Sequence, residues 1–241
     1  MYETLMNKSH KGRRDKVELV FNGIKQMLYV DTLVPGQKLI CQDLARKLNT
    51  SITPVVQALK GLTEANFVQY VPNKGYFVGE ITETEAKELF QVREALETYI
   101  IPQVIESLDR NKIENLKTIY KEYKKISAPE QLRFRWMKDS RFHLKITEYS
   151  GNRVIYHVLE DVLEHIVLRY KPEYLLEGRM REAEREHSNI LEALEERNVE
   201  KTQALMRDHI RNGLRYLLRS LPMGLLGVEE AEILSKKGEL S

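Results

Sequence analysis

The stretch Ser51-Ile52-Thr53-Pro54-Val55-Val56-Gln57-Ala58-Leu59 decides the fold of the N-terminal part of this 241-residue chain. A Ser at the cap position and a Pro among the first helical residues predict a helix that begins at about Ile52. A short amphipathic helix precedes it at about Cys41–Leu48, and two short strands follow between Phe67 and Val78. This order predicts a helix-turn-helix with a β-hairpin wing, which presents a helix N-terminus to DNA phosphates and base edges.

The residues around this stretch complete a small N-terminal domain. Apolar residues at helical spacing predict a first helix from about Asp15 to Val30. Pro72-Asn73-Lys74-Gly75, between the two strands, has the composition of a hairpin turn. Residues 1–14, which end in Arg13-Arg14, are expected to form a basic arm. Residues 1–80 hold 11 Lys+Arg and 7 Asp+Glu, a net +4, whereas the rest of the chain is net −2. The positive charge therefore lies where DNA binding is expected.

Beyond Gly79 the pattern is helical only. Thr82 with Glu85 has the pattern of a capping box and predicts a long helix through about Leu108. Further amphipathic segments follow at roughly 111–126, 130–149, 152–170, 179–197 and 199–219. Short loops between helices favour antiparallel neighbours. The predicted fold class is mainly α: an N-terminal winged helix-turn-helix with a small β-hairpin wing, and a C-terminal all-α antiparallel six-helix bundle.

Four parts follow from these patterns. They are a basic arm (1–14), a winged helix-turn-helix DNA-binding domain (15–80), a helical effector- and metal-binding domain (81–221) and a tail without an assigned role (222–241). No apolar run approaches the ~20 residues that cross a bilayer. The first residues lack the apolar segment of a secretory leader, and a single cysteine, Cys41, excludes an internal disulfide framework. We therefore expect a cytoplasmic protein without a membrane partner.

The helix that begins at Ile52 has two faces. Its apolar face, expected in the core, holds Val55, Ala58, Leu59 and Leu62. Its outward face holds Thr53, Gln57 and Lys60, with Ile52 and Val56 beside them. On one hypothesis Gln57 reads adenine while Ile52 and Val56 touch thymine methyls, which favours an A·T-rich site. The alternative is a degenerate reader that Lys60, Lys74 and the Arg13-Arg14 arm hold on phosphates.

Four metal-ligand side chains fall on inward faces of the predicted bundle. Asp139 and His143 are spaced i, i+4 on a face that also carries Leu132, Trp136, Phe142 and Ile146. His187 and His209 lie on the apolar stripes of two later helices. An unsatisfied buried polar group costs ~1–3 kcal/mol, and one shared cation would satisfy all four. Three imidazoles and a carboxylate suit Zn, Ni, Fe or Mn. The alternative is that these histidines are hydrogen-bonded core residues.

Arg93 belongs to the same interior. It falls between Leu89, Leu96 and Ile100 on the inward face of the first bundle helix. A buried guanidinium needs an anionic partner and prefers a bidentate carboxylate. Arg93 is therefore a candidate for binding a small carboxylate metabolite. The alternative is an internal ion pair with Asp139 or another acid of the bundle.

Several motifs together resemble the GntR family of bacterial transcription regulators. They are Pro35-Gly36-Gln37-Lys38-Leu39, Asp43-Leu44-Ala45, Thr53-Pro54-Val55 with Ala58-Leu59, and Asn73-Lys74-Gly75-Tyr76-Phe77-Val78. The helical remainder resembles the FCD subfamily, whose C-terminal domain is of the FadR type. This resemblance implies a homodimer that binds a pseudo-palindromic, double-stranded operator and responds to a small metabolite. It also implies a metal site at Asp139, His143, His187 and His209, and an arginine, Arg93, that faces the effector.

The chain departs from the family pattern in the reading helix. The family usually has arginine after the cap residue and again four residues later, where this chain has Ile52 and Val56. A further frequent arginine corresponds to Gln42. Arginines at these places pair with guanine and phosphate, so their loss predicts a shifted operator preference. The predicted DNA contacts are Arg13, Arg14, Gln42, Ser51, Ile52, Thr53, Val56, Gln57, Lys60, Asn73 and Lys74.

The leading interpretation is a transcription regulator that responds to a ligand through a divalent metal and a small carboxylate. A metal-dependent enzyme is a second interpretation, since three histidines and a carboxylate can activate water. No further Glu or His is spaced to act as a general base on the same face, so we expect no enzyme. A third interpretation is a regulator that binds acyl ligands without metal, and a fourth is a metal that only cross-links the bundle.

Overall fold

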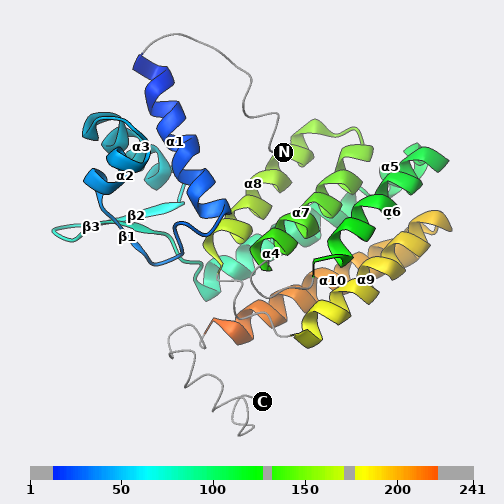
Figure 1. Ribbon diagram of the computed structural model, residues 1–241. Helices are drawn as coiled ribbons and strands as arrows, with labels where there is room; N and C mark the ends of the chain where they lie inside the picture. The colour runs from blue at the N-terminus through cyan, green and yellow to red at the C-terminus, as the bar shows by residue number, and fades with distance from the viewer. Residues whose placement is uncertain (1–12, 127–131, 171–176, 222–241) are drawn as a thin grey trace, which may run out of the picture. The chain divides into compact units, whose positions relative to one another are not determined.

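The computed structural model describes residues 13–126, 132–170 and 177–221. The chain divides into two compact units, one that ends at Glu80 and one that begins at Ile81 (Figure 1). Among the helices in these ranges, none has the length and apolar character needed to cross a bilayer.

The N-terminal unit contains a helix-turn-helix and a small antiparallel sheet. The three strands stand in the order β1-β3-β2, so the last strand in the chain is the central one. The elements are α1 (Arg13–Tyr29), β1 (Lys38–Leu39), α2 (Cys41–Lys47), α3 (Ile52–Glu64), β2 (Val68–Val71) and β3 (Gly75–Val78).

The core of this unit lies between α1 and α3, which pack against each other. Their buried apolar side chains follow the helical spacing seen in the sequence: Val20, Ile24 and Leu28 on α1, with Val55, Ala58, Leu59 and Leu62 on α3. Phe67, which directly precedes β2, and Val68 and Val78 in the sheet are also buried. The exposed side of α3 is therefore fixed by the burial of its opposite side.

The N-terminal unit differs from the sequence prediction in two details. The first helix begins at Arg13, so Arg13 and Arg14 belong to α1 and not to the arm; residues 1–12 lie outside the described ranges. The strand β1 was not predicted, because two residues carry no period-2 pattern. It follows Gly36, whose φ of +80° suits glycine. The amide of Gly36 donates to the carbonyl of Val78 at 3.0 Å, which joins this turn to β3.

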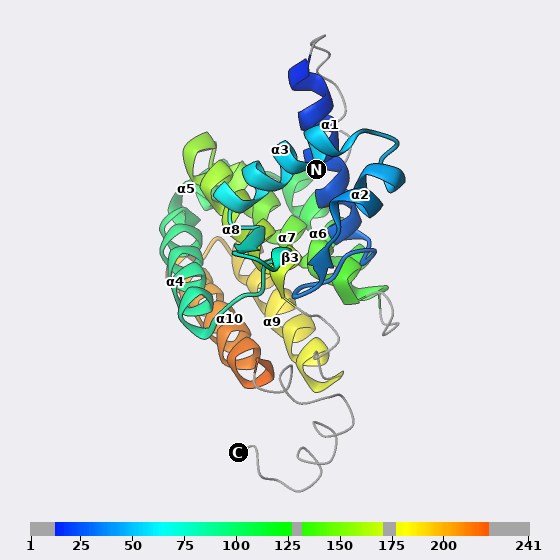
Figure 2. The ribbon, with the colours of Figure 1, turned by 90° about the vertical axis from the view of Figure 1, so that its left-hand side faces the viewer.

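The C-terminal unit is a helical bundle. Here α10 packs along α4 and α9, α7 packs against α6 and α8, α4 also contacts α8, and α6 contacts α9 (Figure 2). The elements are α4 (Glu83–Tyr99), α5 (Ile101–Ser107), α6 (Arg110–Lys124), α7 (Leu132–Tyr149), α8 (Arg153–Arg169), α9 (Glu177–Glu195) and α10 (Val199–Ser220).

The mainly helical fold class is confirmed, but the first predicted bundle helix is two helices. The helix is interrupted at Ile100, so the described part of the bundle has two helices, α4 and α5, where one was expected. Pro102 lacks the N–H that would bond to the carbonyl of Thr98. That carbonyl instead accepts from the side-chain amide of Gln203 on α10, at 3.0 Å. The freed acceptor thus becomes a contact between helices.

The predicted capping box at the start of α4 is half formed. The hydroxyl of Thr82 accepts from the backbone N–H of Glu85 at 3.2 Å. The carboxylate of Glu85 does not return to the cap, because it pairs with the guanidinium of Arg169 at the end of α8, at 2.7 Å between Nη2 and Oε2. This pair ties the first bundle helix to α8.

Candidate metal centre and DNA-reading surface

The predicted reading helix α3 begins after a cap residue whose side chain makes no hydrogen bond to the helix. Ser51 has the extended backbone of an N-cap but makes no side-chain cap hydrogen bond. A Ser cap normally accepts from the N–H of the second or third helical residue. The third residue of α3 is Pro54, which has no N–H. The Ser51 hydroxyl is therefore not used by the helix it precedes.

The predicted base-reading residues lie on the exposed side of α3. Ile52 is 46% exposed, Thr53, Gln57 and Lys60 are exposed, and Val56 is half-buried. These side chains stand opposite the buried apolar face of the same helix.

The other predicted DNA contacts are spread over α2, the wing and the start of α1. Gln42 is exposed on α2, and Asn73 and Lys74 are exposed at the tip of the wing. Asn73 has a φ of +63° at the second central position of a turn in which Lys74 N donates to the carbonyl of Val71 at 3.0 Å. The side chains of Arg13 and Arg14 lie outside what the structure describes.

In the helical unit, α7, α9 and α10 bring the four predicted ligands together. One ligand atom from each of Asp139, His143, His187 and His209 lies within 4.8 Å of all the others. The Nε2 atom of His143 is 3.1 Å from Nε2 of His209 and 3.4 Å from Nε2 of His187. The carboxylate of Asp139 is 3.3 Å from Nε2 of His187 and 3.8 Å from Nε2 of His143. The three imidazoles are buried and Asp139 is partly exposed.

Two glutamates hold two of these imidazoles from behind. Glu97 Oε2 is 2.5 Å from Nδ1 of His143, and Glu186 Oε2 is 2.7 Å from Nδ1 of His209. An ionised carboxylate can only accept, so each imidazole donates its Nδ1–H. Burial raises the pKa of the Glu97 carboxyl, but the charges of His143 and Arg93 and their hydrogen bonds outweigh burial and lower it to about 2. For Glu186, burial likewise raises the pKa, but the hydrogen bond and charge of His209 and the charge of Arg179 lower it to about 2.

His187 is held differently. Its Nδ1 has no hydrogen-bond partner among the described residues. Its ring packs against the rings of Phe142 and Tyr123, with centroids 4.8 and 5.0 Å away. Burial, followed by the charges of His209 and His143, lowers the pKa of His187 well below its usual value. The ring is therefore neutral near neutral pH, which is the form that binds a metal.

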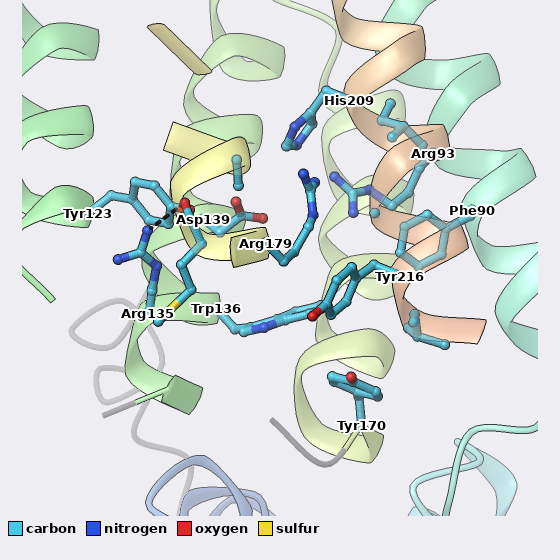
Figure 3. Close-up of a pocket in the computed structure, with 15 residues that line it drawn as sticks. Phe90, Arg93, Tyr123, Arg135, Trp136, Asp139, Tyr170, Arg179, His209 and Tyr216 are labelled. Carbon is cyan, nitrogen blue, oxygen red and sulfur yellow. Dashed lines mark hydrogen bonds between the residues drawn. The ribbon is translucent and has the colours of Figure 1, made fainter. Parts of the chain in front are cut away.

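A cavity opens beside Asp139 and His209 (Figure 3). Its wall contains Arg93, Arg135 and Arg179 and the rings of Phe90, Tyr123, Trp136, Tyr170 and Tyr216. Arg93 is buried; its Nε donates to Glu97 Oε1 at 2.8 Å, while its Nη2 has no hydrogen-bond partner among the described residues. Arg179 Nη1 donates to Glu186 Oε2 at 2.8 Å. The cavity thus combines an aromatic wall with guanidinium groups.

Sequence reasoning found the four clustered side chains and the inward Arg93 but missed the residues behind them. Arg93 does form an internal ion pair, and its partner is Glu97. Their i, i+4 spacing on one helix was the signal that could have found this pair. Glu186 gave no such signal, because it directly precedes His187 and so lies on a different side of α9. Arg179 belongs to the same helix and was not singled out either.

Comparison with known proteins gives two family matches. A family model described as "FCD domain" matches residues 88–212. A second, described as "Bacterial regulatory proteins, gntR family", matches residues 16–78.

Curated relatives match over most of their length. "Uncharacterized HTH-type transcriptional regulator YdhC" of Bacillus subtilis (strain 168) is 23% identical over 213 residues, which cover 85% of this chain and 92% of the relative. "HTH-type transcriptional regulator McbR" of Escherichia coli (strain K12) is 25% identical over 183 residues, covering 75% of this chain and 83% of the relative.

Solved structures share the fold. The structure titled "E. coli McbR/YncC" superposes with a TM-score of 0.69 at 23% identity, over 85% of this chain and 98% of the other. A putative GntR regulator from Rhodococcus sp. RHA1 superposes with a TM-score of 0.71 at 18% identity, with the same coverage of each chain.

Proposed function

The chain belongs to the GntR family of bacterial transcription regulators and carries an FCD domain, and from this premise we propose that a divalent transition metal and a small carboxylate metabolite control its DNA binding. The matched families and relatives are DNA-binding regulators and not enzymes. The proposed ligands are Asp139, His143, His187 and His209, and the proposed anchor of the carboxylate is Arg93. The observation that carries the proposal is the convergence of three Nε2 atoms and one carboxylate.

The distances within the cluster suit one shared ion. Zinc binds imidazole nitrogen at ~2.1 Å, so two nitrogens on one ion lie ~3.0 Å apart at a right angle and ~3.4 Å apart at a tetrahedral angle. The Nε2–Nε2 distances from His143 to His209 and to His187 are 3.1 and 3.4 Å. Donors of this kind suit Zn, Ni, Fe or Mn.

The hydrogen bonds behind the ligands give a second reason. His143 and His209 each donate Nδ1–H to a carboxylate, so in their neutral forms both Nε2 atoms carry lone pairs. Two lone pairs 3.1 Å apart repel each other and cannot form a hydrogen bond. A cation between them removes the repulsion, and a carboxylate behind a histidine is the usual support of a metal ligand.

The residues that line the cavity favour an anionic effector. Arg93 has one guanidinium nitrogen, Nη2, buried without a hydrogen-bond partner among the described residues. An unsatisfied buried donor is costly, and one on a guanidinium is best satisfied by a carboxylate. The cavity also touches Asp139 and His209, so a small acid there would reach both Arg93 and the metal.

On the DNA side we propose a homodimer whose two reading helices meet two half-sites of a pseudo-palindromic operator. The proposed contacts are those of α3, Gln42 and the wing, together with Arg13 and Arg14. Half-sites lie about one helical turn apart, so a change in the spacing of the two readers alters affinity. An effector that favours one arrangement of the dimer would bias that spacing.

Metal content tests the first half of the proposal. We expect about one transition metal per wild-type chain and a loss of that metal in His143→Ala and His209→Ala. His157→Ala is the matched control, since His157 is exposed on α8 and should change nothing. Elemental analysis after dialysis against metal-free buffer measures this. Stoichiometric metal in the His143 and His209 variants would refute the site.

Operator binding tests the second half. Arg93→Lys keeps a positive charge for Glu97 but removes the guanidinium fork. We expect its affinity for operator DNA to lose the response to acetate, lactate, malate or citrate, while its metal content stays near wild type. Arg211→Lys, an exposed arginine paired with Glu94 on α4, is the control. If the wild type binds metal but no carboxylate changes its affinity for operator DNA, the result favours a metal that only cross-links the bundle. If carboxylates still change that affinity after the metal is removed, the result favours a regulator that works without metal.

A further inference from the structure

Two Arg–Glu pairs connect the wall of the cavity with the proposed metal ligands. On α4, Arg93 Nε donates to Glu97 Oε1 at 2.8 Å, and Glu97 Oε2 accepts from His143 Nδ1 at 2.5 Å. On α9, Arg179 Nη1 donates to Glu186 Oε2 at 2.8 Å, and the same oxygen accepts from His209 Nδ1 at 2.7 Å. Both arginines line the cavity. Each glutamate is therefore shared between a cavity wall and a ligand.

The two chains of contacts are built alike from different helices, but they differ in burial. Glu97 is 1% exposed and both of its oxygens are engaged, one by Arg93 and one by His143. Glu186 is partly exposed at its side chain, and its second oxygen accepts from the amide of Asn212 at 2.7 Å. Neither carboxylate faces the space between the three Nε2 atoms, because each meets its histidine at Nδ1.

In each pair, the arginine that contacts the carboxylate affects how strongly that carboxylate stabilises the histidine on its other side. A guanidinium that holds the carboxylate draws negative charge away from the imidazole. When an anion binds the same guanidinium, that pull weakens and the carboxylate stabilises the imidazole more strongly. The basicity of the opposite nitrogen, Nε2, then increases, and a more basic nitrogen is a stronger metal ligand. In a buried site such effects are weakly screened.

We propose that Glu97 and Glu186 are positioning residues that couple the anion-binding cavity to the metal ligands, so that the two bind cooperatively. Each glutamate fixes its histidine with Nε2 toward the cluster, and each relays the state of a cavity arginine. Coupling of this kind is reciprocal: a metal that tightens anion binding is itself bound more tightly when the anion is present. The inference rests on the proposed function, since it needs a metal at the cluster and an anion in the cavity that Arg93 and Arg179 line.

The experiment measures the Kd of the full-length protein for Zn²⁺ by competition with a chromogenic chelator, without acetate and at saturating acetate. Wild type should bind Zn²⁺ at least about fivefold more tightly with acetate, the low end of typical coupling. Glu97→Gln and Glu186→Gln keep the size of the side chain and lose its charge. Each should weaken Zn²⁺ binding ~10–100-fold, as loss of a partner behind a ligand does, and should reduce the acetate effect.

Glu94→Gln is the matched control, because Glu94 lies on α4 and pairs with Arg211 but contacts no proposed ligand. It should bind Zn²⁺ as wild type does. Glu186→Gln is the second variant in case the more buried Glu97→Gln fails to fold, which thermal unfolding of the metal-free proteins reports. A merely structural role would lower the unfolding temperature and leave the ratio of the two Kd values unchanged.

The outcomes separate the inference from the proposed function. Wild-type Zn²⁺ affinity and acetate effect in both glutamine variants overturn the inference, while dependence of binding on His143 still supports the site. A wild type that binds Zn²⁺ with no acetate effect also overturns it. A wild type that binds no Zn²⁺, or a His143→Ala variant that binds it as well, overturns the proposed function and the inference together.

Discussion

Residues of the same capping type behave differently at the ends of this chain's helices. The side chains of Asp109 and Asn198 each accept a backbone N–H at the start of their helices, at 2.8 and 2.9 Å. Ser51 holds the same position before α3 without such a bond, because Pro54 offers no N–H where Ser would bond. The local sequence therefore distinguishes a cap residue that bonds to its helix from one that does not.

This contrast predicts that two alanine substitutions differ in their effect on stability. Asn198→Ala should lower the free energy of unfolding by about 1 kcal/mol, the usual loss for a helix cap. Ser51→Ala should leave stability within about 0.5 kcal/mol, yet weaken DNA binding if its hydroxyl meets a phosphate. Denaturant unfolding and DNA titration measure the two quantities. A loss of stability at Ser51 equal to that at Asn198 would contradict the assignment.

Among the elements, the wing offers a simple test of phosphate contact. Lys74 is exposed at the tip between β2 and β3. Lys74→Ala should weaken binding across DNA sequences and flatten the salt dependence by about one unit, as loss of one phosphate contact does. Lys87→Ala, on α4 and paired with Glu83, should leave the slope unchanged. A slope at wild-type value in Lys74→Ala would remove the wing tip from the interface.

The sequence predicted elements well wherever an apolar period ran over several turns. The cores of α1 and α3 and the inward placement of Arg93, His143, His187 and His209 all follow from helical spacing. What it missed depends on contacts between distant segments. The strand β1 exists because β3 pairs with it, and Glu186 matters because α10 brings His209 to it. No local sequence pattern indicates either the β1–β3 pairing or the contact between Glu186 and His209.

The break after α4 has a local signal that the apolar pattern outweighs. Pro102 sits inside a stretch whose apolar residues continue at helical spacing through Leu108. A proline in such a stretch ends or kinks the helix before it. The capping pattern at Thr82 together with this spacing predicts a single long helix, whereas the helix ends at Tyr99.

For the whole molecule, the family resemblance drawn from short motifs is confirmed over two separate regions, residues 16–78 and 88–212. The assignment as a regulator and not an enzyme is also confirmed by the matched families and relatives. The metal, the carboxylate and the dimer stay predictions. They concern bound partners, which folding patterns within one chain specify only through the shape and charge of a site.

The division into two units predicts how metal affects stability. A ligand present at 100 times its Kd stabilises the fold that binds it by ~2.7 kcal/mol. Zn²⁺ should therefore raise the unfolding temperature of the helical unit, which holds all four proposed ligands. Calorimetry of the full chain with and without Zn²⁺ measures this change. The transition of the N-terminal unit should move less. A stabilisation by Zn²⁺ that persists in His143→Ala would show that the metal acts elsewhere.

The strand order β1-β3-β2 also has a consequence for folding during synthesis on the ribosome. Lys38 and Leu39 find their partners in Phe77 and Tyr76, so α2 and α3 lie within a loop that closes only when the last strand arrives. Non-local pairing of this kind is slow to form, because the loop must close before its contacts form. The DNA reader therefore cannot complete its fold during synthesis until Val78 has left the exit tunnel, and nascent chains stalled before that point will lack the sheet.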